Sequence, residues 1–281
     1  MSTRARAWLW LGVGCAAAVA VAGCSSPRRP REDERRAEPR PAPVAAVVAV
    51  DAGGAGAGDA AAGGDAAAAD KLAVVEAPMA WSEERAALTL EYRRHHSDPD
   101  ARDLEIEPRV IVLHYTGAGT AKSTLHTFAP ARLGGRPELS RGGAVNVSAH
   151  FLVDRDGTIM RLQPETRYAR HCIGLNHISI GIENVGDEKR WKLTEAQVQA
   201  NAALVRDLTQ RFSTITHLLG HFEVMKFRAH PYFVERDAGY RNRKPDPGAR
   251  FLTEVRAHVT DLGLQGLSAS DDAAKPVHPT K

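Results

Sequence analysis

The sequence predicts an α/β fold in which helices flank a mixed central β-sheet, and three observations support this fold class. Residues 109–114 form a short apolar run rich in β-branched side chains, as in a strand that is covered on both faces. Residues 149–163 have the pattern of a β-hairpin, and an amphipathic helix is expected to begin after Thr194. Because strands and helices alternate along the chain, we expect them to pack in layers around one sheet.

The predicted hairpin and the strand that follows it form the middle of the sheet. The hairpin joins 149–153 to 158–163. Asp156 and Gly157 lie between these two runs, and this pair of residues favours a tight turn. Residues 178–183 form another apolar run that indicates a buried strand.

The amphipathic helix has a clear start signal. Thr194 and Gln197 have the spacing of a capping box, in which each side chain bonds the backbone of the other residue. The apolar residues that fall on one helical face are Val198, Ala202, Val205, Leu208 and Phe212. Residues 215–220 then return to an apolar, β-branched pattern, which predicts the next strand.

A last helix is expected near the end of the folded region. Its apolar positions at helical spacing are Leu252, Val255, Val259 and Leu262. Gly263 follows in the position that favours a left-handed cap, so the helix is expected to end there. Residues 78–265 have an ordinary globular composition, which predicts one domain.

The start of the chain has the layout of a secretory signal segment. Arg4 and Arg6 precede an apolar run over 7–22, which is too short for a comfortable membrane span. Residues 21–24, Val-Ala-Gly-Cys, resemble the lipobox of bacterial lipoproteins, and this resemblance implies cleavage before Cys24 and acylation of its thiol. The alternative is an ordinary signal peptide with a chance cysteine.

Composition divides the rest of the chain. After the cysteine the sequence is rich in Arg, Pro and Glu and then in Ala and Gly, with few large apolar side chains to bury, which indicates a disordered tether. Serine after the lipobox cysteine resembles the sorting signal for the outer membrane, on its periplasmic side. The expected segments are a signal peptide over 1–23, a lipidated linker over 24–77, the domain over 78–265 and a disordered tail over 266–281.

The charge gives no support for a nucleic-acid partner, and the cysteine content gives none for an internal disulfide. A formal net charge of +3 and a pI near 8.8, without a long Lys/Arg stripe, do not predict nucleic-acid binding. With Cys15 removed and Cys24 acylated, Cys172 is the remaining thiol, so no internal disulfide is expected. The fold therefore depends on its core and on any metal that it binds.

Two histidines are candidates for a metal site. His114 ends one predicted strand and His221 directly follows another. If these strands are neighbours, both imidazoles lie at the same edge of the sheet. A catalytic zinc site needs three protein ligands and one open position, so a third ligand is required. A single histidine is more often a packed or surface residue than a ligand.

A candidate third ligand lies in a proline-rich segment. Pro245 and Pro247 hold the residues before them, Lys244 and Asp246, in extended backbone. Because extended backbone has a period of two, the two side chains point the same way. A carboxylate beside an ammonium suits a metal ligand next to a group that stabilises an oxyanion. The alternative, which local spacing alone slightly favours, is a surface salt bridge in a turn.

The order of five motifs resembles that of the type 2 N-acetylmuramoyl-L-alanine amidases, over roughly residues 109–251. The motifs are His114 after its strand, 147–157, 179–183, Gly220-His221 and 244–248. The family shares its fold with peptidoglycan recognition proteins and with phage amidases of the T7 lysozyme type. The resemblance implies hydrolysis of the amide bond that joins N-acetylmuramic acid to the L-alanine of the stem peptide.

The resemblance also implies a role for each matching residue. It implies one zinc ion per chain, held by His114, His221 and Asp246. Glu183 is implied as the general base, and Lys244 is implied to lie near the substrate carbonyl oxygen. These residue types agree with the chemistry, because a carboxylate can take a proton from water and an ammonium can stabilise a developing negative charge.

His217 has the sequence spacing of a metal ligand but is not expected to be one. His217 and His221 have the i, i+4 spacing of a helical zinc pair. The β-branched Ile215 and Thr216, together with Gly220, favour a strand instead, in which positions i and i+4 lie about 13 Å apart. His217 is therefore excluded from the expected ligands.

The remaining histidines and the cysteine are weaker candidates. His150 and His171 match family positions near the cleft, and both a supporting role at the site and a structural hydrogen bond remain open for them. The residues without motif support as ligands are His126, His177, His230 and Cys172.

Two departures from the family pattern concern the substrate cleft. Arg170 precedes His171 where many relatives have tryptophan. The segment between His221 and Asp246 is longer than in the compact family pattern and carries several aromatic residues. This segment and the Gly/Arg/Pro-rich stretch over 127–147 are expected to form loops that shape the groove.

The function expected from the sequence is therefore a zinc amidase of cell-wall turnover or remodelling, with peptidoglycan or muropeptides as substrate and the membrane as a partner through lipidated Cys24. The alternative is a non-catalytic lipoprotein that binds peptidoglycan and tethers the membrane to the wall. Non-catalytic members of this fold typically lose a metal ligand, and none of the three is lost in this sequence. A third possibility is a zinc peptidase that cuts elsewhere in the stem peptide.

Overall fold

The computed structural model describes residues 72–267. The predicted signal peptide 1–23 and the proposed lipidation site Cys24 lie outside the described residues. So do most of the predicted linker 24–77 and most of the predicted tail 266–281. Within the described range, no helix has the length and apolar character needed to cross a lipid bilayer.

The described elements alternate between strands and helices, as predicted. The strands are β1 Val75–Glu76, β2 Val110–Tyr115, β3 Phe151–Val153, β4 Ile159–Arg161, β5 Ser179–Asn184 and β6 His217–Gly220. The α-helices are α1 Glu83–His96, α2 Ala121–Phe128, α3 Pro137–Ser140, α4 Glu195–Arg211 and α5 Ala249–Ala257. Short 3₁₀ helices are η1 His221–Glu223, η2 Phe227–Ala229 and η3 Thr260–Leu262.

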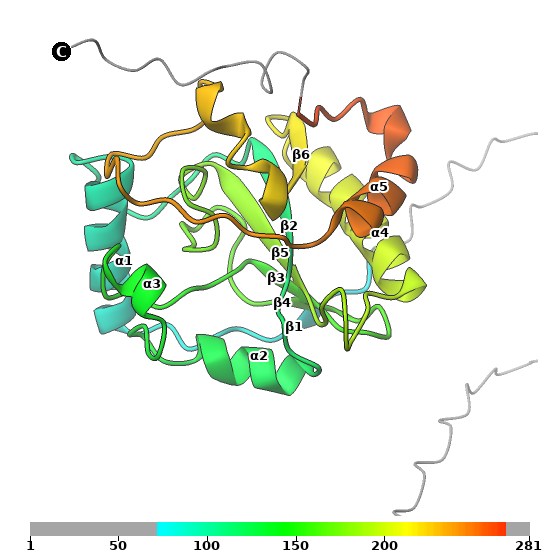
Figure 1. Cartoon of the computed structure of the whole chain (residues 1–281), viewed down its shortest axis with the longest axis horizontal. Coiled ribbons are helices and arrows are strands. Elements are labelled where there is room, and N and C mark those ends of the chain that lie inside the picture. Colours follow the sequence, from blue (N-terminus) through cyan, green and yellow to red (C-terminus); the bar gives the residue numbers. More distant parts are fainter. Residues whose placement is uncertain (1–71, 268–281) are drawn as a thin grey trace, which may run out of the picture. The chain divides into compact units, whose positions relative to one another are not determined.

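One mixed sheet forms the centre of the domain, in the strand order β1-β4-β3-β5-β2-β6. The predicted hairpin is present as the antiparallel pair β3 and β4, and the other neighbouring strands pair in parallel. The expected fold class, a mixed sheet flanked by helices, is confirmed (Figure 1). The parallel strands β5, β2 and β6 lie side by side, so their carboxyl ends share one edge of the sheet.

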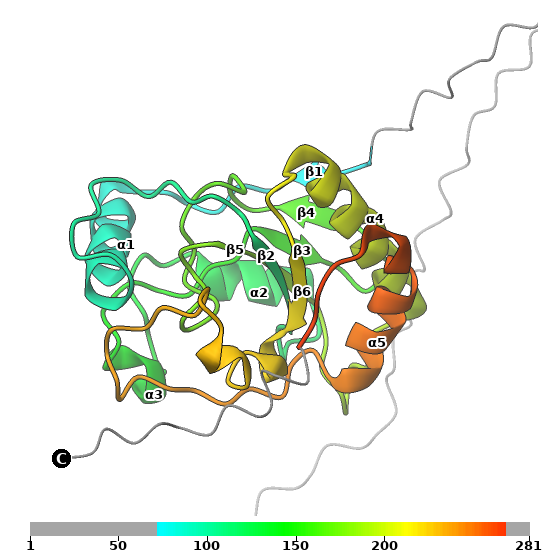
Figure 2. The same ribbon diagram turned by 90° about the horizontal axis from the view of Figure 1, so that it is seen from above.

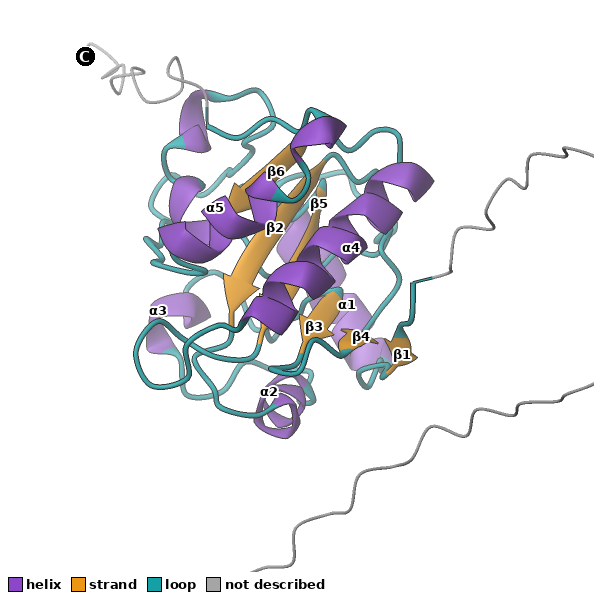
Figure 3. Ribbon diagram, turned by 90° about the vertical axis from the view of Figure 1, so that its right-hand side faces the viewer, coloured by secondary structure: helices purple, strands orange, loops and turns teal. Residues whose placement is uncertain are grey.

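Both faces of the sheet are covered, which explains the continuous apolar run in β2. Ile111 and Leu113 pack in the core cluster that includes α4 and α5, and these two helices lie together on one face (Figure 3). Val110 and Val112 point to the other face, where they pack with Leu175. The helix α1 lies on the far side of the molecule from α4 and α5 (Figure 2). By strand periodicity, His114 shares the face of Val110 and Val112.

The start of α4 confirms the predicted capping box. The Thr194 hydroxyl accepts a hydrogen bond from the Gln197 backbone N–H, and the Gln197 side chain accepts one from the Thr194 N–H. The Gln197 amide also donates to the carbonyls of Val153 and Val185. The cap therefore fixes the helix to β3 and to the end of β5.

Several boundaries differ from the sequence prediction. The last helix is not continuous, because α5 ends at Ala257 and the chain tightens into i→i+3 hydrogen bonds before η3. Gly263 has the expected left-handed conformation, with φ of 63°, but it caps η3. The sheet includes β1, which lies before residue 78, the predicted start of the domain. The stretch 127–147, predicted as a loop, contains α3.

Candidate metal centre and its pocket

Three neighbouring parallel strands bring the predicted site residues to one level of the sheet. His114 on β2 pairs in register with Glu183 on β5. On the other side of β2, Leu113 pairs with Gly220, so His221 follows at the level of His114. The carboxyl ends of parallel strands are the usual place for a binding site in an open α/β sheet. His114 and His221 therefore lie at the same edge of the sheet, as their positions at strand ends predicted.

The third predicted ligand reaches the histidines from the loop before α5. The Oδ2 atom of Asp246 lies 3.1 Å from Nδ1 of His114 and 3.1 Å from Nδ1 of His221. A hydrogen bond of 2.9 Å from the Phe222 N–H to the Asp246 carbonyl holds this loop against η1. One ligand atom from each of the three side chains lies within 4.8 Å of the others, so the group could hold a metal ion.

Burial sets the charge state of this group. Burial and the neighbouring His221 lower the pKa of His114 to about 4, so its imidazole is neutral at neutral pH. Burial alone would raise the pKa of Asp246, but its close contacts with the imidazoles of His114 and His221 hold it well below its ordinary value. A neutral imidazole and an ionised carboxylate are the forms in which these side chains bind metals. The donor set therefore fits a divalent cation.

Glu183 lies beside this group with a free carboxylate oxygen. Its Oε2 is inaccessible to solvent and has no hydrogen-bond partner among the described residues. Burial and the charge of Asp246 raise the pKa of Glu183 to about 8, whereas the cations Lys244 and Arg136 act in the opposite direction. Above that pKa the ionised carboxylate, with its raised proton affinity, is suited to accept a proton from a water molecule.

These groups share one pocket with a volume of about 270 Å³. Lys244 lines it beside Asp246, as the period-two argument predicted, and Arg136 lines it as a second cation. The residues of the pocket wall that come from the two predicted loops, from α1 and from the segment before β5 include Tyr92, Leu139, Arg170, Ile173, Tyr240 and Asn242. The site thus combines a polar floor with a partly aromatic wall.

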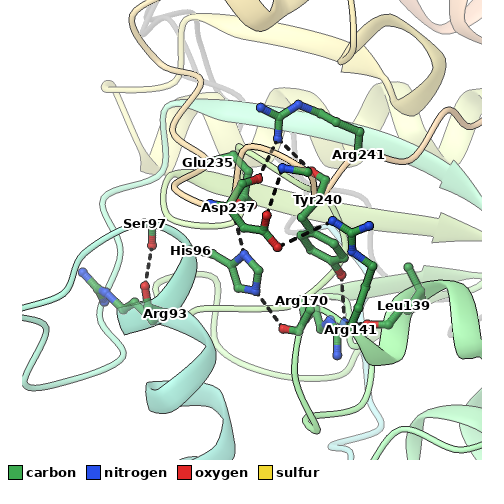
Figure 4. Close-up of polar contacts among 12 residues, drawn as sticks. Arg93, His96, Ser97, Leu139, Arg141, Arg170, Glu235, Asp237, Tyr240 and Arg241 are labelled. Carbon is green, nitrogen blue, oxygen red and sulfur yellow. Dashed lines mark hydrogen bonds and ion pairs between the residues drawn. The ribbon is translucent and has the colours of Figure 1, made fainter.

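A network of buried hydrogen bonds fixes that wall (Figure 4). The guanidinium of Arg170 donates to the Tyr240 hydroxyl at 2.8 Å, to the Leu139 carbonyl at 2.6 Å and to the carbonyl of Val145. Only 3% of the Arg170 surface is exposed. Arg170 therefore ties the loop over 127–147 to the segment between His221 and Asp246 at the cleft.

A second branch of the network joins the long segment between His221 and Asp246 to α1. His96, the last residue of α1, lies with Nδ1 2.8 Å from the Glu235 carboxylate and Nε2 2.7 Å from the Gly142 carbonyl. Its ring packs on Tyr240, with 4.7 Å between the centroids. The expected role of the long segment in shaping the groove agrees with this arrangement, because Tyr240 lines the pocket.

His217 does not take part in the metal group. It lies in a strand, as predicted, although β6 begins at His217 and not at Ile215. Its ring contacts those of Phe227, His230 and Tyr232. His150 is fully buried and makes structural hydrogen bonds, so the structural alternative holds for it. Cys172 is a buried free thiol in the core beneath the pocket.

His171 is the residue whose position the sequence left most open. Its Nδ1 lies 3.0 Å from Nε2 of His114, so it contacts a predicted metal ligand directly. Burial and the neighbouring His114 and His150 keep the pKa of His171 well below its ordinary value. Arg136 was not predicted at all, because it comes from a loop and carries no local signal.

The chain is similar to proteins that are described as amidases. A family model described as N-acetylmuramoyl-L-alanine amidase matches residues 104–249. Among solved structures, the endolysin N-acetylmuramoyl-L-alanine amidase LysCS from Clostridium intestinale URNW is 22% identical, with 69% of this chain and 97% of that chain covered and a TM-score of 0.42. A selenomethionine derivative of AmpD is 24% identical, with 66% and 93% covered and a TM-score of 0.42. No curated protein sequence matches the chain.

A recognition protein is also among the similar structures. Peptidoglycan recognition protein-LE, solved in complex with tracheal cytotoxin, is 19% identical, with 55% of this chain and 82% of that chain covered and a TM-score of 0.39. The family match covers more than half of the 281 residues and includes all five predicted site residues, His114, Glu183, His221, Lys244 and Asp246. The chain belongs to the N-acetylmuramoyl-L-alanine amidase family.

Proposed function

We propose that the chain is a zinc-dependent hydrolase of the amide bond between N-acetylmuramic acid and L-alanine in peptidoglycan or muropeptides. One observation carries this proposal. The candidate metal ligands His114, His221 and Asp246 lie in the same pocket as Glu183, whose carboxylate has an unpartnered oxygen. Membership of the amidase family supports this substrate class and this bond.

Two imidazole nitrogens and one carboxylate are a known ligand set of catalytic zinc, and they leave one coordination position open. When bound, zinc supplies a Lewis acid that lowers the pKa of water toward about 7 and polarises a carbonyl group. The three donor atoms already lie within 4.8 Å of one another, which supports a shared metal ion.

The chain's own residues supply the proton transfer and the charge stabilisation. The Glu183 carboxylate accepts a proton from the attacking water and can return it to the departing amine of L-alanine. The ammonium of Lys244 stabilises the negative charge that develops on the substrate carbonyl oxygen. Hydrogen bonding between the loops positions Tyr240 against the rest of the substrate.

The test is digestion of purified peptidoglycan by the full chain with zinc present. We expect free stem peptides with an unblocked L-alanine amine, together with glycan strands whose muramic acid keeps its lactyl group. Cleavage at another bond of the stem would indicate a peptidase, and mass spectrometry of the products distinguishes the two. Binding without any released peptide would contradict the proposal and would favour a recognition protein.

We also propose, from residues 21–24 of the sequence, that the protein is an outer-membrane lipoprotein that faces the periplasm and acts in wall turnover or remodelling. Acyl chains on Cys24 would anchor the domain, since more than one chain gives stable membrane binding. Mass spectrometry of the N-terminal peptide and fractionation of membranes test this. A Cys24→Ser variant is expected in the soluble fraction, and unchanged membrane association would contradict the anchor.

A further inference from the structure

His171 lies between a predicted metal ligand and the backbone of β5. Its Nδ1 is 3.0 Å from Nε2 of His114. Its Nε2 is 3.3 Å from the Ser179 carbonyl oxygen and 3.2 Å from the Ser179 hydroxyl oxygen. A Cβ atom at Gly181 would come within 2.7 Å of the His171 ring, so the absence of a side chain there makes room for the imidazole.

The hydrogen bonds around Ser179 fix which nitrogen of His171 carries the proton. The Ser179 hydroxyl donates its only hydrogen to the Leu175 carbonyl at 2.7 Å. Both Ser179 oxygens near His171 are therefore acceptors. A neutral imidazole has one N–H, so His171 carries it on Nε2 and presents a lone pair on Nδ1.

The tautomer of His171 determines the tautomer of His114. Because Nδ1 of His171 accepts, Nε2 of His114 carries the hydrogen and donates it across the 3.0 Å contact. The Nδ1 atom of His114 is left with a free lone pair. This is the nitrogen that lies 3.1 Å from Asp246 Oδ2, inside the candidate metal group.

We propose that His171 is a positioning residue of the metal centre: its Nδ1 accepts the Nε2 hydrogen of His114 and so fixes the tautomer in which His114 Nδ1 binds the metal. This inference rests on the proposed function, because it takes zinc as the metal. Partners that orient a ligating histidine are usually carboxylates or carbonyls, and their loss typically weakens metal binding about 10–100-fold. In this chain a second imidazole takes that place.

His150 provides a matched control. It is also fully buried, and its ring centroid lies 5.8 Å from that of His171. Its Nδ1 accepts from the Gly181 N–H and its Nε2 donates to the Arg167 carbonyl, so both of these hydrogen bonds go to backbone groups. A loss of packing around β5 would affect variants of both histidines, whereas a loss of the acceptor for His114 would affect only His171.

The experiment compares zinc affinity in the full chain, by competition with a chromophoric chelator, for wild type, His171→Leu, His171→Asn and His150→Asn. We expect His171→Leu to bind zinc about 10–100-fold more weakly. His171→Asn, whose amide oxygen can accept in place of Nδ1, should recover most of the affinity. His150→Asn should bind zinc like the wild type. Equal affinity of His171→Leu and wild type would overturn the inference.

A second measurement needs no variant. Nitrogen-15 NMR of histidine in the zinc-loaded wild type reports the tautomer of each ring. We expect hydrogen on Nε2 of both His114 and His171, and hydrogen on Nδ1 of His171 would overturn the inference. Failure of the wild type to bind zinc would overturn the proposed function as well. A wild type that binds zinc and cleaves peptidoglycan, beside a His171→Leu variant of equal affinity, would overturn this inference alone.

Discussion

His114 on β2 and Glu183 on β5 are paired in register, so the first predicted metal ligand and the predicted general base leave the sheet at the same level and on the same face. Parallel pairing holds both residues through the backbone of two buried strands. The distance between ligand and base is thus set by the sheet itself, whereas Asp246 reaches them from a loop.

The first prediction concerns Glu183. Glu183→Gln keeps the shape of the side chain but cannot accept a proton, so the rate of amide hydrolysis should fall by about 10²–10⁴-fold. Zinc content should stay unchanged, because Glu183 is outside the ligand group. The exposed Glu91→Gln serves as the control in the same peptide-release assay. Activity of Glu183→Gln near that of the control would remove Glu183 from the mechanism.

The second prediction concerns Lys244. Lys244 lines the pocket beside Asp246, and we propose that its ammonium stabilises charge that exists only during the reaction. Lys244→Met should therefore lower kcat by about 10²–10³-fold with a smaller effect on KM. The exposed Lys192→Met should match the wild type in steady-state assays on a soluble muropeptide. A rise in KM at constant kcat would instead assign Lys244 to ground-state binding.

The third prediction tests the contact between β5 and His171. Gly181→Ala places a Cβ where it would lie 2.7 Å from the His171 ring, and the ring must move. Zinc affinity should therefore fall even though every imidazole is retained. Gly134→Ala is the matched control, because its Cβ meets no atom within 4 Å. Equal zinc affinity in the two variants would show that the ring position is not important for the metal.

The fourth prediction concerns acid stability. Burial lowers the pKa of His150 from 6.5 to about 4. A depressed pKa means that its contribution to stability is complete above pH 6.5 and is lost as the pH falls toward 4. At about 1.4 kcal/mol per pH unit the loss reaches about 3 kcal/mol.

Urea unfolding of the metal-free protein between pH 4 and pH 7 measures this effect. His150→Asn keeps an acceptor for the Gly181 N–H but does not titrate, so its free energy of unfolding should depend less steeply on pH than that of the wild type. Parallel pH profiles for the two proteins would exclude His150 as the source of the acid sensitivity.

The fifth prediction concerns the pocket wall. Tyr240→Phe removes one hydrogen bond to Arg170 and should lower the free energy of unfolding by about 1 kcal/mol. Arg170→Met leaves the carbonyls of Leu139 and Val145 without that donor and should lower it by roughly 3 kcal/mol. Urea unfolding measures both values, and equal losses would show that the guanidinium does not hold the loops together.

The ligand group could be predicted from the sequence because the ordered series of motifs resembles that of the amidases, whereas the local signal of each single member is weak. His114 and His221 follow apolar strands, and the two prolines around Asp246 fix the direction of its side chain. Parallel strands then necessarily bring such residues to one edge. The register between β2 and β5, which sets the distance from His114 to Glu183, has no local signal and comes from the structure.

The helix α1 is an element that the sequence pattern does not predict. Its buried residues, Arg85, Thr89, Tyr92 and His96, fall at helical spacing but are mostly polar, so the sequence shows no apolar stripe. Arg85 is buried because it donates to the carbonyls at the end of α2, which lie far along the chain. The contact between His171 and His114 is likewise made by a loop, and periodicity gives no information about it.

Zinc content measured together with peptide release tests the central claim most directly, in the wild type and in Asp246→Ala. The wild type should hold one zinc ion per chain and release stem peptides, whereas Asp246→Ala should lose both the metal and the activity while remaining folded by circular dichroism. Full zinc content and full activity in Asp246→Ala would contradict the proposed metal centre.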